Sequence, residues 1–310
     1  MIANKLKYGD EIRVVAPSRS LSIVRMDIYD NALSYLESKG FKVTFSKNSR
    51  EMNEFMSAEI KSRVADIHEA FADDNVKMIF SCIGGFNVNH ILKYLDYELI
   101  KAKPKILCGY SDITALLHAI YAKTGLVTYH GPHFSTFGFD KEAEYTRKYF
   151  YDCVMNDKPV SIKPSEAAKE YYVIQEGSCE GQIIGGNLCT LNLLQGTPYM
   201  PDLKDKVLFI EDDNIMGDYF AFEFDRNLQS LMQVCGAEAV KGIVFGSFDE
   251  SCKLNKDIIK KIVKDKVASD IPVVFGVDFG HVFPMITFPV GGRVKMEVRD
   301  GEISIQIVQH

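Results

Sequence analysis

Short apolar runs alternate with amphipathic stretches along the first 130 residues of this chain, and this alternation constrains the fold most strongly. The amphipathic stretches carry apolar residues at helical spacing, whereas the apolar runs have the length of buried strands. Strands are expected at 12–16, 41–45, 76–83, 106–108 and 126–129, and helices at 24–38, 58–71, 88–95 and 112–122. Repeated β–α units form a mostly parallel sheet with helices on both faces. We therefore predict an N-terminal doubly wound α/β domain.

The second half of the chain continues the α/β pattern and ends in a predicted hairpin. Strands are expected at 181–184, 207–210, 242–248 and 272–277, and helices after residue 187 and at 228–234 and 256–267. Residues 294–299 and 303–308 alternate around Asp300-Gly301, a pair typical of tight hairpin turns. Residues 141–172 are rich in charge and tyrosine. We predict an N-terminal domain over 1–140, a connection over 141–172, and a C-terminal α/β domain with the hairpin over 173–310.

Composition argues against several classes of protein. The 310-residue chain has a net charge of −6 and no block of basic residues, which disfavours nucleic acid and anionic lipid as partners. The first ten residues are polar, unlike a signal peptide, and no apolar run reaches the length of a membrane span. Seven scattered cysteines without a C-x-x-C motif are typical of reduced thiols. We expect a cytoplasmic protein that has no membrane partner.

The segment 105–114, KILCGYSDIT, predicts a strand, a sharp turn and a helix, with Ser111 at the turn. A serine there projects its hydroxyl from the carboxyl end of the sheet, beside the amide of Asp112 and the start of the helix dipole. Both features favour a developing oxyanion, as an enzyme that acylates a serine requires. A serine before an apolar helical run is equally a good N-cap, and on local sequence alone capping is the simpler interpretation.

Three further polar segments follow predicted strands, where ligands bind in open α/β sheets. Gly84-Gly85 would let a backbone amide approach a ligand closely. Glu211 follows an apolar run and is placed to orient a histidine, although Asp212 and Asp213 beside it are alternatives. His281 lies in a glycine-rich loop after the run that ends at residue 277, whereas His130 and His133 follow an earlier strand and could line a cleft. The order Ser, acid, His is compatible with a serine-hydrolase triad.

At these positions the chain resembles the LD-carboxypeptidase family of serine peptidases, which includes the microcin C immunity proteins. The resemblance runs nearly end to end and rests on ordered motifs at 14–18, 84–85, 104–114, 131–132, 185–188, 209–212 and 280–281. It implies a two-domain α/β fold with the active site between the domains. It also implies a homodimer and the use of no metal or other cofactor.

The resemblance implies a catalytic triad of Ser111, Glu211 and His281, with the backbone amides of Gly85 and Asp112 as the oxyanion hole. A carboxypeptidase must also hold a terminal carboxylate, for which Arg226 is a candidate, although a surface charge on a helix is an equally good interpretation. Asn187 and Tyr199 are further candidates for substrate binding.

Two branches of the family differ in substrate. One trims murein tetrapeptides during cell-wall recycling, and the other hydrolyses an amide that joins an acidic residue to a nucleotide. Motifs at 81–87, 95–97 and 197–201 resemble the microcin-immunity branch more closely. That branch stacks the nucleobase on a tryptophan, which this chain lacks; Tyr199, Tyr219 and Phe220 are candidate replacements.

We therefore expect a serine-type carboxypeptidase or amide hydrolase that acts on a small peptide or a peptidyl nucleotide and has no nucleic-acid partner. A murein tetrapeptide carboxypeptidase is the alternative. A non-catalytic α/β protein that binds a small ligand is the more remote one. A dinucleotide-binding enzyme is disfavoured because no G-x-G-x-x-G motif follows the first strand.

Overall fold

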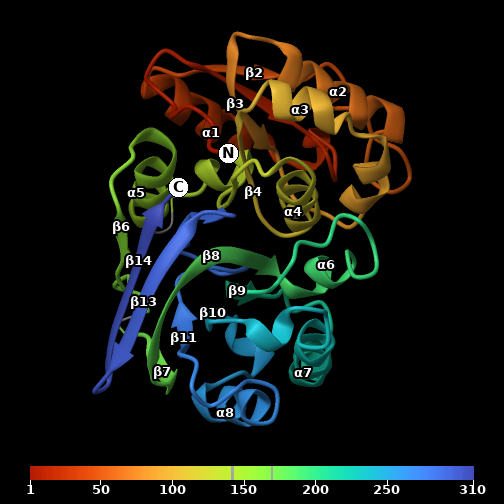
Figure 1. Ribbon diagram of the computed structural model, residues 1–310. Coiled ribbons are helices and arrows are strands. Elements are labelled where there is room, and N and C mark those ends of the chain that lie inside the picture. The colour runs from red at the N-terminus through yellow and green to blue at the C-terminus, as the bar shows by residue number, and fades with distance from the viewer. Residues whose placement is uncertain (141–142, 169) are drawn as a thin grey trace.

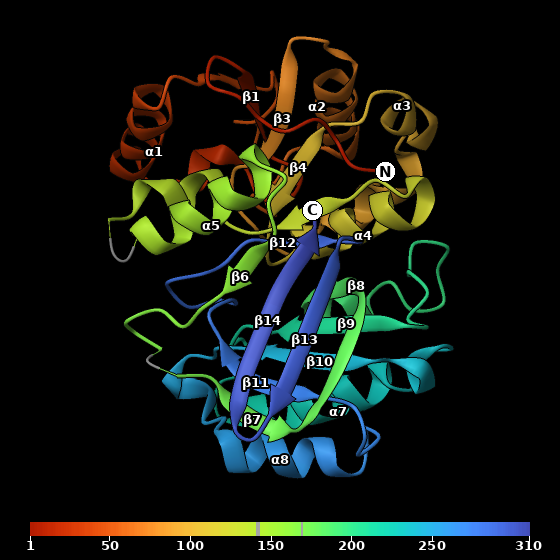
Figure 2. The same cartoon turned by 60° about the vertical axis from the view of Figure 1, so that its left-hand side comes forward.

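The computed structural model describes residues 1–140, 143–168 and 170–310, and it contains two β-sheets. Figures 1 and 2 show the N-terminal part of the chain, coloured red to yellow, above the C-terminal part, coloured green to blue. Helices and strands alternate in both parts, so the predicted α/β class is confirmed. Residues 141, 142 and 169 of the expected connection lie outside the described residues.

The N-terminal sheet has six strands in the order β12-β5-β4-β3-β1-β2. Their bounds are β1 (Glu11–Val15), β2 (Lys42–Phe45), β3 (Val76–Ser81), β4 (Ile106–Gly109), β5 (Thr128–His130) and β12 (Phe288–Val290). All pairs are parallel except β12 with β5. Because parallel strands end at the same edge, the turns after β1, β3 and β4 lie close together there.

Helices cover both faces of the N-terminal sheet, as a doubly wound fold requires (Figure 1). Their bounds are α1 (Met26–Ser38), α2 (Ile60–Ala72), α3 (Tyr97–Ala102), α4 (Ile113–Thr124) and α5 (Ala143–Met155). Helix α5 packs on one face, where Phe150 stacks on Phe80 of β3 with the ring centroids 5.5 Å apart. Helix α4 ends where Gly125 adopts a left-handed conformation with φ 73°, as a glycine at a helix C-terminus permits.

The C-terminal sheet is mixed and has eight strands in the order β6-β14-β13-β8-β9-β10-β11-β7. Their bounds are β6 (Val160–Ile162), β7 (Tyr172–Gln175), β8 (Gly177–Asn187), β9 (Lys206–Glu211), β10 (Gly242–Gly246), β11 (Val273–Val277), β13 (Arg293–Arg299) and β14 (Glu302–Gln309). Strands β8 to β11 are parallel. The hairpin β13–β14 turns at Asp300 and Gly301, both with positive φ, as predicted.

Helices α6 (Leu188–Asn192), α7 (Phe220–Leu231) and α8 (Lys256–Lys264) accompany the C-terminal sheet. Helix α7 begins eight residues before the predicted helix at 228–234, at Phe220 rather than Leu228. The segment FAFEFD alternates like a strand, which hid the helical pattern formed by Phe220, Phe224 and Leu228, all of them buried. None of the helices in the described ranges is long and apolar enough to span a bilayer.

One strand of the C-terminal part joins the N-terminal sheet. Strand β12 comes from the C-terminal part but pairs with β5, and the Phe288 ring stacks on His130 at a centroid distance of 4.5 Å. Helix α5 and strand β6 occupy half of the stretch expected to be a connection, and they pack on the N-terminal and C-terminal sheets respectively. The division at 1–140 and 173–310 stays a proposal, and β12 is an exception to it.

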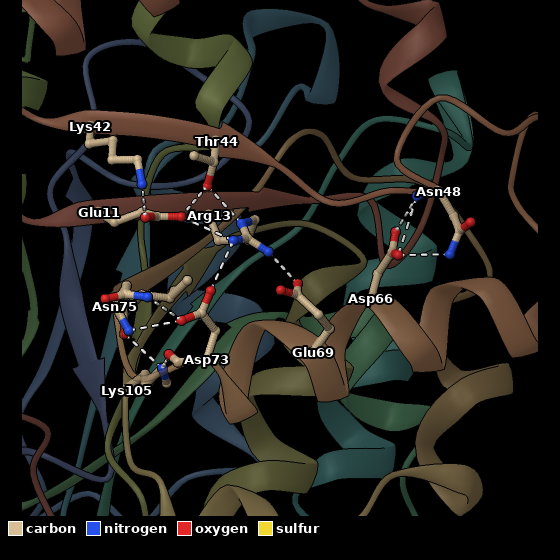
Figure 3. Close-up of polar contacts among 11 residues, drawn as sticks. Glu11, Arg13, Lys42, Thr44, Asn48, Asp66, Glu69, Asp73, Asn75 and Lys105 are labelled. Atoms are coloured by element: carbon tan, nitrogen blue, oxygen red, sulfur yellow. Dashed lines mark hydrogen bonds and ion pairs between the residues drawn. The ribbon is translucent and has the colours of Figure 1, made fainter.

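A charged network lies around Glu11 at the start of β1, at the opposite end of the strand from the turn that leads to the site (Figure 3). Buried Glu11 on β1 accepts hydrogen bonds from Arg13, Lys42 and Thr44 at 3.0, 2.6 and 2.7 Å. Arg13 also pairs with Glu69 of α2. Burial alone would raise the pKa of Glu11, but these hydrogen bonds outweigh it and lower the pKa to about 2. Strands β1 and β2 and helix α2 are thus tied together on this side.

Candidate active site

Ser111 stands in a strained turn between β4 and α4. Its φ is 61°, in the left-handed region that few residues other than glycine adopt. Its carbonyl oxygen accepts a hydrogen bond from the Thr114 amide, which starts the helix, while its hydroxyl caps no backbone amide in the described structure. Strain of this kind persists where the surroundings enforce it, commonly at functional sites. The side chain therefore does not act as the N-cap that local sequence suggested.

The hydroxyl of Ser111 contacts an imidazole that comes from the other sheet. His281 Nε2 lies 2.9 Å from Ser111 Oγ, and His281 Nδ1 lies 2.8 Å from Glu211 Oε2. Ser111 follows β4, Glu211 is the last residue of β9, and His281 follows β11. The carboxyl ends of strands from both sheets thus meet here. The structure brings together the three side chains predicted from sequence.

Burial and neighbouring charges shift the pKa values of Glu211 and His281 in opposite directions. Burial alone would raise the pKa of Glu211, but the imidazoles of His281 and His130 outweigh it and hold the pKa below its usual range. Burial alone would lower the pKa of His281, but Glu211, Asp213 and Asp212 raise it to about 9. Glu211 is therefore an ionised carboxylate that stabilises the charged form of His281.

Other titratable groups surround the pair. His130 Nε2 lies 3.6 Å from the second oxygen of Glu211, and both side chains are almost completely buried. Asp213 Oδ2 lies 3.7 Å from His281 Nε2, the nitrogen that faces Ser111. Asp212 is directed away, because its carboxylate accepts hydrogen bonds from Asn187 Nδ2 and from backbone amides. In the described part of the chain no three His, Cys, Asp or Glu side chains form a group suited to hold a metal ion.

Two backbone amides near Ser111 are free to receive a ligand. The N–H groups of Gly85 and Asp112 have no hydrogen-bond partner among the described residues. A methyl group on Gly84 would lie 2.9 Å from Ser111 Cβ and 3.0 Å from its Oγ, so only glycine fits this close approach. The loop after β3 therefore passes directly beside the hydroxyl.

The carboxylate of Asp112 ties three strand-end loops together. Its Oδ2 accepts hydrogen bonds from the amides of Asn87 and Val88 at 2.9 Å and from Ser18 Oγ at 2.5 Å. Ser18 follows β1, Asn87 lies in the loop after β3, and Asp112 itself belongs to the turn after β4. Asp112 is nearly fully buried. Its side chain thus fixes the loops that flank Gly85, while its own amide stays free.

A cavity of about 400 Å³ opens beside Ser111 and His281. Its polar lining includes Arg19, Tyr110 and His133, and its apolar lining comes mainly from the segment 23–28 and from residues 139 and 283. His133 lies almost completely buried against Tyr110, with the ring centroids 4.2 Å apart. The cavity has room for a small substrate group next to the hydroxyl.

The remaining candidates from sequence lie elsewhere. Asn187 caps α6, where its Oδ1 accepts from the Thr190 amide, and it is 1% exposed. Tyr199 packs on Tyr97 with a centroid distance of 6.1 Å. Arg226 lies on the surface of α7 with its side chain 70% exposed and is paired with Glu223. None of the three lines the cavity beside Ser111.

The aromatic replacements for tryptophan differ in accessibility. Phe220 is buried against Phe224 and Phe248, so it is not available to stack on a ligand, and that expectation is wrong. Tyr219 and Phe222 are exposed by 68% and 73%, and their ring centroids lie 6.5 Å apart. They follow the acidic segment at 211–213.

Sequence reasoning did not single out Arg19, which the structure places here. Arg19 lies four residues after the end of β1. The rule that ligands bind at strand ends applies to it, so it was the available signal. Its proximity to Ser111 and His281 depends on how the two sheets meet, which local patterns do not contain.

Comparison with known proteins shows the family of this chain. The chain belongs to the LD-carboxypeptidase family, because the N-terminal domain of that family matches residues 12–131 and its C-terminal domain matches residues 180–296. The "Putative carboxypeptidase YocD" of Bacillus subtilis (strain 168) is 47% identical, with both chains covered completely. The crystal structure of an MccF-like protein from Bacillus anthracis str. Ames has a TM-score of 0.97 and 48% identity, again with full coverage of both chains.

The more distant relatives include both murein peptide carboxypeptidases and microcin self-immunity proteins. The "Probable murein peptide carboxypeptidase" of Bacillus subtilis (strain 168) is 31% identical, covering 95% of this chain and 91% of the relative. The structure of the microcin C7 self-immunity protein MccF in complex with aspartyl sulfamoyl adenosine is 28% identical with a TM-score of 0.83, covering 100% of this chain and 99% of that one. The protein is thus a hydrolase of the serine-peptidase type within a family that includes both.

Proposed function

We propose that this protein is a serine-type amide hydrolase in which Ser111, His281 and Glu211 act as the catalytic triad. The single observation that carries the proposal is the continuous chain of contacts from the Ser111 hydroxyl through both ring nitrogens of His281 to the buried Glu211 carboxylate, at 2.9 and 2.8 Å. A nucleophile, a base and an orienting acid need this geometry.

In the proposed reaction His281 Nε2 takes the proton of Ser111 as Oγ attacks the scissile carbonyl carbon. The amides of Gly85 and Asp112 donate hydrogen bonds to the oxyanion. The bond to the leaving nitrogen then breaks, and His281 supplies the proton that the amine requires. Water, deprotonated by His281, next attacks the acyl carbon; the bond to Ser111 Oγ breaks, His281 returns the proton to Oγ, and the acid product leaves. Loss of one oxyanion donor would raise the barrier by about 3 kcal/mol.

Glu211 acts through His281 in this scheme. Its Oε2 accepts the Nδ1–H hydrogen bond and leaves Nε2 free to face the serine. His130 lies beside the other oxygen of Glu211 and is a positioning residue for the carboxylate. Asp112 has two roles in this scheme. Its backbone amide donates to the oxyanion, and its side chain binds the neighbouring loops.

For the substrate, we favour an amide between an acidic residue and a nucleotide, as in the microcin-immunity branch. The support is the similarity to the MccF-like protein of Bacillus anthracis together with the exposed pair Tyr219 and Phe222, which offers aromatic faces to a nucleobase. A murein tetrapeptide is the second candidate, supported by the murein peptide carboxypeptidase among the relatives. We also propose a homodimer in the cytoplasm, as expected for the family.

A hydrolysis panel tests the proposal. Purified wild type and Ser111→Ala are incubated with a murein tetrapeptide and with aspartyl sulfamoyl adenosine, and the products are separated by mass. We expect the wild type to cleave at least one substrate and Ser111→Ala to cleave neither. Exposed Ser38 on α1 supplies the matched control, because Ser38→Ala should retain wild-type activity.

A serine-directed fluorophosphonate probe separates an enzyme from a protein that only binds a ligand. The probe should label the wild type at Ser111, because His281 activates that hydroxyl. It should not label Ser111→Ala. Failure of the wild type both to react and to cleave either substrate would favour the non-catalytic alternative.

A further inference from the structure

The cavity beside Ser111 carries positive charge without an opposing negative charge. Arg19 and Arg25 line it, and none of the described residues that line it is Asp or Glu. Arg25 is exposed and already paired with Asp27, with Nε 3.0 Å from Oδ1. Of the two arginines, Arg19 is therefore the one that can serve a ligand in this cavity.

The guanidinium of Arg19 is held by one hydrogen bond and has donors left for a ligand. Its Nε donates a hydrogen bond to the carbonyl oxygen of Gly84 at 3.1 Å. Within the described part of the chain its two terminal nitrogens make no hydrogen bond or ion pair. Because Gly84 also touches Ser111, this anchor holds the guanidinium at a defined position relative to the nucleophile. A guanidinium placed in this way suits a carboxylate, which can accept two parallel N–H bonds.

The neighbouring His133 supports an anionic ligand without competing for it. Neither ring nitrogen of His133 has a hydrogen-bond partner in the described structure, although the side chain is only 2% exposed. Burial, with His281, His130 and Arg19 nearby, lowers the pKa of His133 well below its usual value. The ring is thus neutral and offers one N–H and one acceptor on the cavity wall.

We propose that Arg19 binds a carboxylate of the substrate in this cavity and so selects acidic substrates for the proposed hydrolysis. The inference rests on the proposed function and deepens it. Much of the remaining lining is apolar and comes from Ile23, Val24, Ile28, Phe139 and Phe283. The group that carries the carboxylate is therefore short and largely apolar, with its charge directed to Arg19.

A carboxylate at this position has two possible sources. In a peptide it is the terminal carboxylate of the residue that leaves. In an aminoacyl nucleotide it is the side-chain carboxylate of the acidic residue whose acyl group is transferred to Ser111. Both present the same chemistry to Arg19, so matched ligand pairs that differ only in that charge distinguish them.

Binding to Ser111→Ala, measured by titration calorimetry, tests the assignment without any turnover. One ligand pair is a murein tetrapeptide with a free C-terminal carboxylate and the same peptide as its C-terminal amide. The other pair is aspartyl and asparaginyl sulfamoyl adenosine. In the Ser111→Ala background we expect one acid to bind at least about tenfold more tightly than its amide partner, since a charge-assisted pair is lost in the amide.

Substitution of Arg19 should remove that preference. In Ser111→Ala/Arg19→Gln the acid and the amide of the responding pair should bind within about twofold of each other, whereas Arg19→Lys should keep part of the preference because it keeps the charge. Arg226→Gln is the matched control, because it removes an exposed guanidinium that does not line the cavity. Its preference should equal that of the Ser111→Ala parent.

The outcome also identifies the source of the carboxylate. Loss of preference in the peptide pair assigns the terminal carboxylate, and loss in the nucleotide pair assigns the acidic side chain. An acid preference that survives Arg19→Gln unchanged, or no acid preference in the Ser111→Ala parent, overturns the inference. Failure of the wild type to hydrolyse either substrate would instead count against the proposed function, which the calorimetry does not measure.

Discussion

Glu211 and His281 form an ion pair at the carboxyl edge of the C-terminal sheet, with Oε2 2.8 Å from Nδ1. Glu211 ends β9, and His281 follows β11, so β10 lies between them in the sheet. The pair aims the opposite ring nitrogen at Ser111. Asp213, 3.7 Å from that nitrogen, contributes to the raised pKa of His281.

Replacing Glu211 with Gln should lower kcat by about a hundredfold to ten-thousandfold. The amide carries no charge to stabilise the imidazolium, and its NH₂ group can hold the ring in the wrong tautomer. Steady-state hydrolysis of the better substrate measures the loss, and circular dichroism checks the fold. Activity within threefold of wild type would show that this carboxylate does not orient His281.

Replacing Asp213 with Asn should shift the pH dependence of kcat/KM to lower pH. The base form of His281 predominates only above its pKa of about 9, to which Asp213 contributes at 3.7 Å. Removing that negative charge lowers the pKa, so the rising limb of the profile should move downward.

Asp218→Asn is the matched control for that profile. Asp218 is exposed and paired with Lys253 on the surface. Its variant should keep the wild-type midpoint. Identical midpoints for wild type and Asp213→Asn would contradict the assigned influence of Asp213 on His281.

Replacing Gly84 with Ala should reduce kcat at least about tenfold. The added methyl group would lie 2.9 Å from Ser111 Cβ, so the turn that presents the hydroxyl must shift, and small displacements of reacting groups are costly. The labelling rate with the fluorophosphonate probe measures the same loss independently of substrate. A labelling rate equal to that of wild type would show that the turn tolerates the methyl group.

The left-handed conformation of Ser111 should make Ser111→Gly more stable than Ser111→Ala. At φ 61° an L side chain is strained and glycine is not, so the free energy of unfolding should differ by about 1 kcal/mol in favour of glycine. Urea unfolding of the two inactive variants measures the difference. A more stable alanine variant would mean that the turn relaxes from this conformation.

Replacing Glu11 with Gln should lower the free energy of unfolding at pH 7 by about 1–3 kcal/mol, because Arg13 and Lys42 lose the buried carboxylate that they share (Figure 3). The pKa of Glu11 in the folded protein, about 2, lies below the ordinary pKa of a glutamate carboxyl. Its contribution is therefore complete above the unfolded pKa and disappears as pH falls through the folded value.

Urea unfolding at several pH values measures this contribution. The gap between wild type and Glu11→Gln should narrow as the pH falls from about 5 towards 2. Exposed Glu302 in the hairpin supplies the control, because Glu302→Gln should change stability by less than about 0.5 kcal/mol. A gap that stays constant over this range would contradict the role of the Glu11 charge.

Local patterns were sufficient where an element depends on its own residues. The strand-turn-helix at 106–124 and the hairpin at Asp300-Gly301 were both predicted, because a glycine-bounded apolar run and a tight-turn pair act over a few residues. Helix α5 and strand β12 were not predicted. Both are stabilised by contacts with residues far away in the sequence: α5 packs on Phe80, and β12 pairs with strand β5.

The sequence by itself determined the α/β class, the turn that carries Ser111, and the chain positions of Glu211 and His281. Tertiary structure decided what each neighbour does: Arg19 lines the cavity, His130 and Asp213 lie beside Glu211 and His281, and Arg226 stays on the surface. The physical reason is that each strand end is set by local periodicity, whereas the meeting of two sheets is set by packing between residues far apart in the chain.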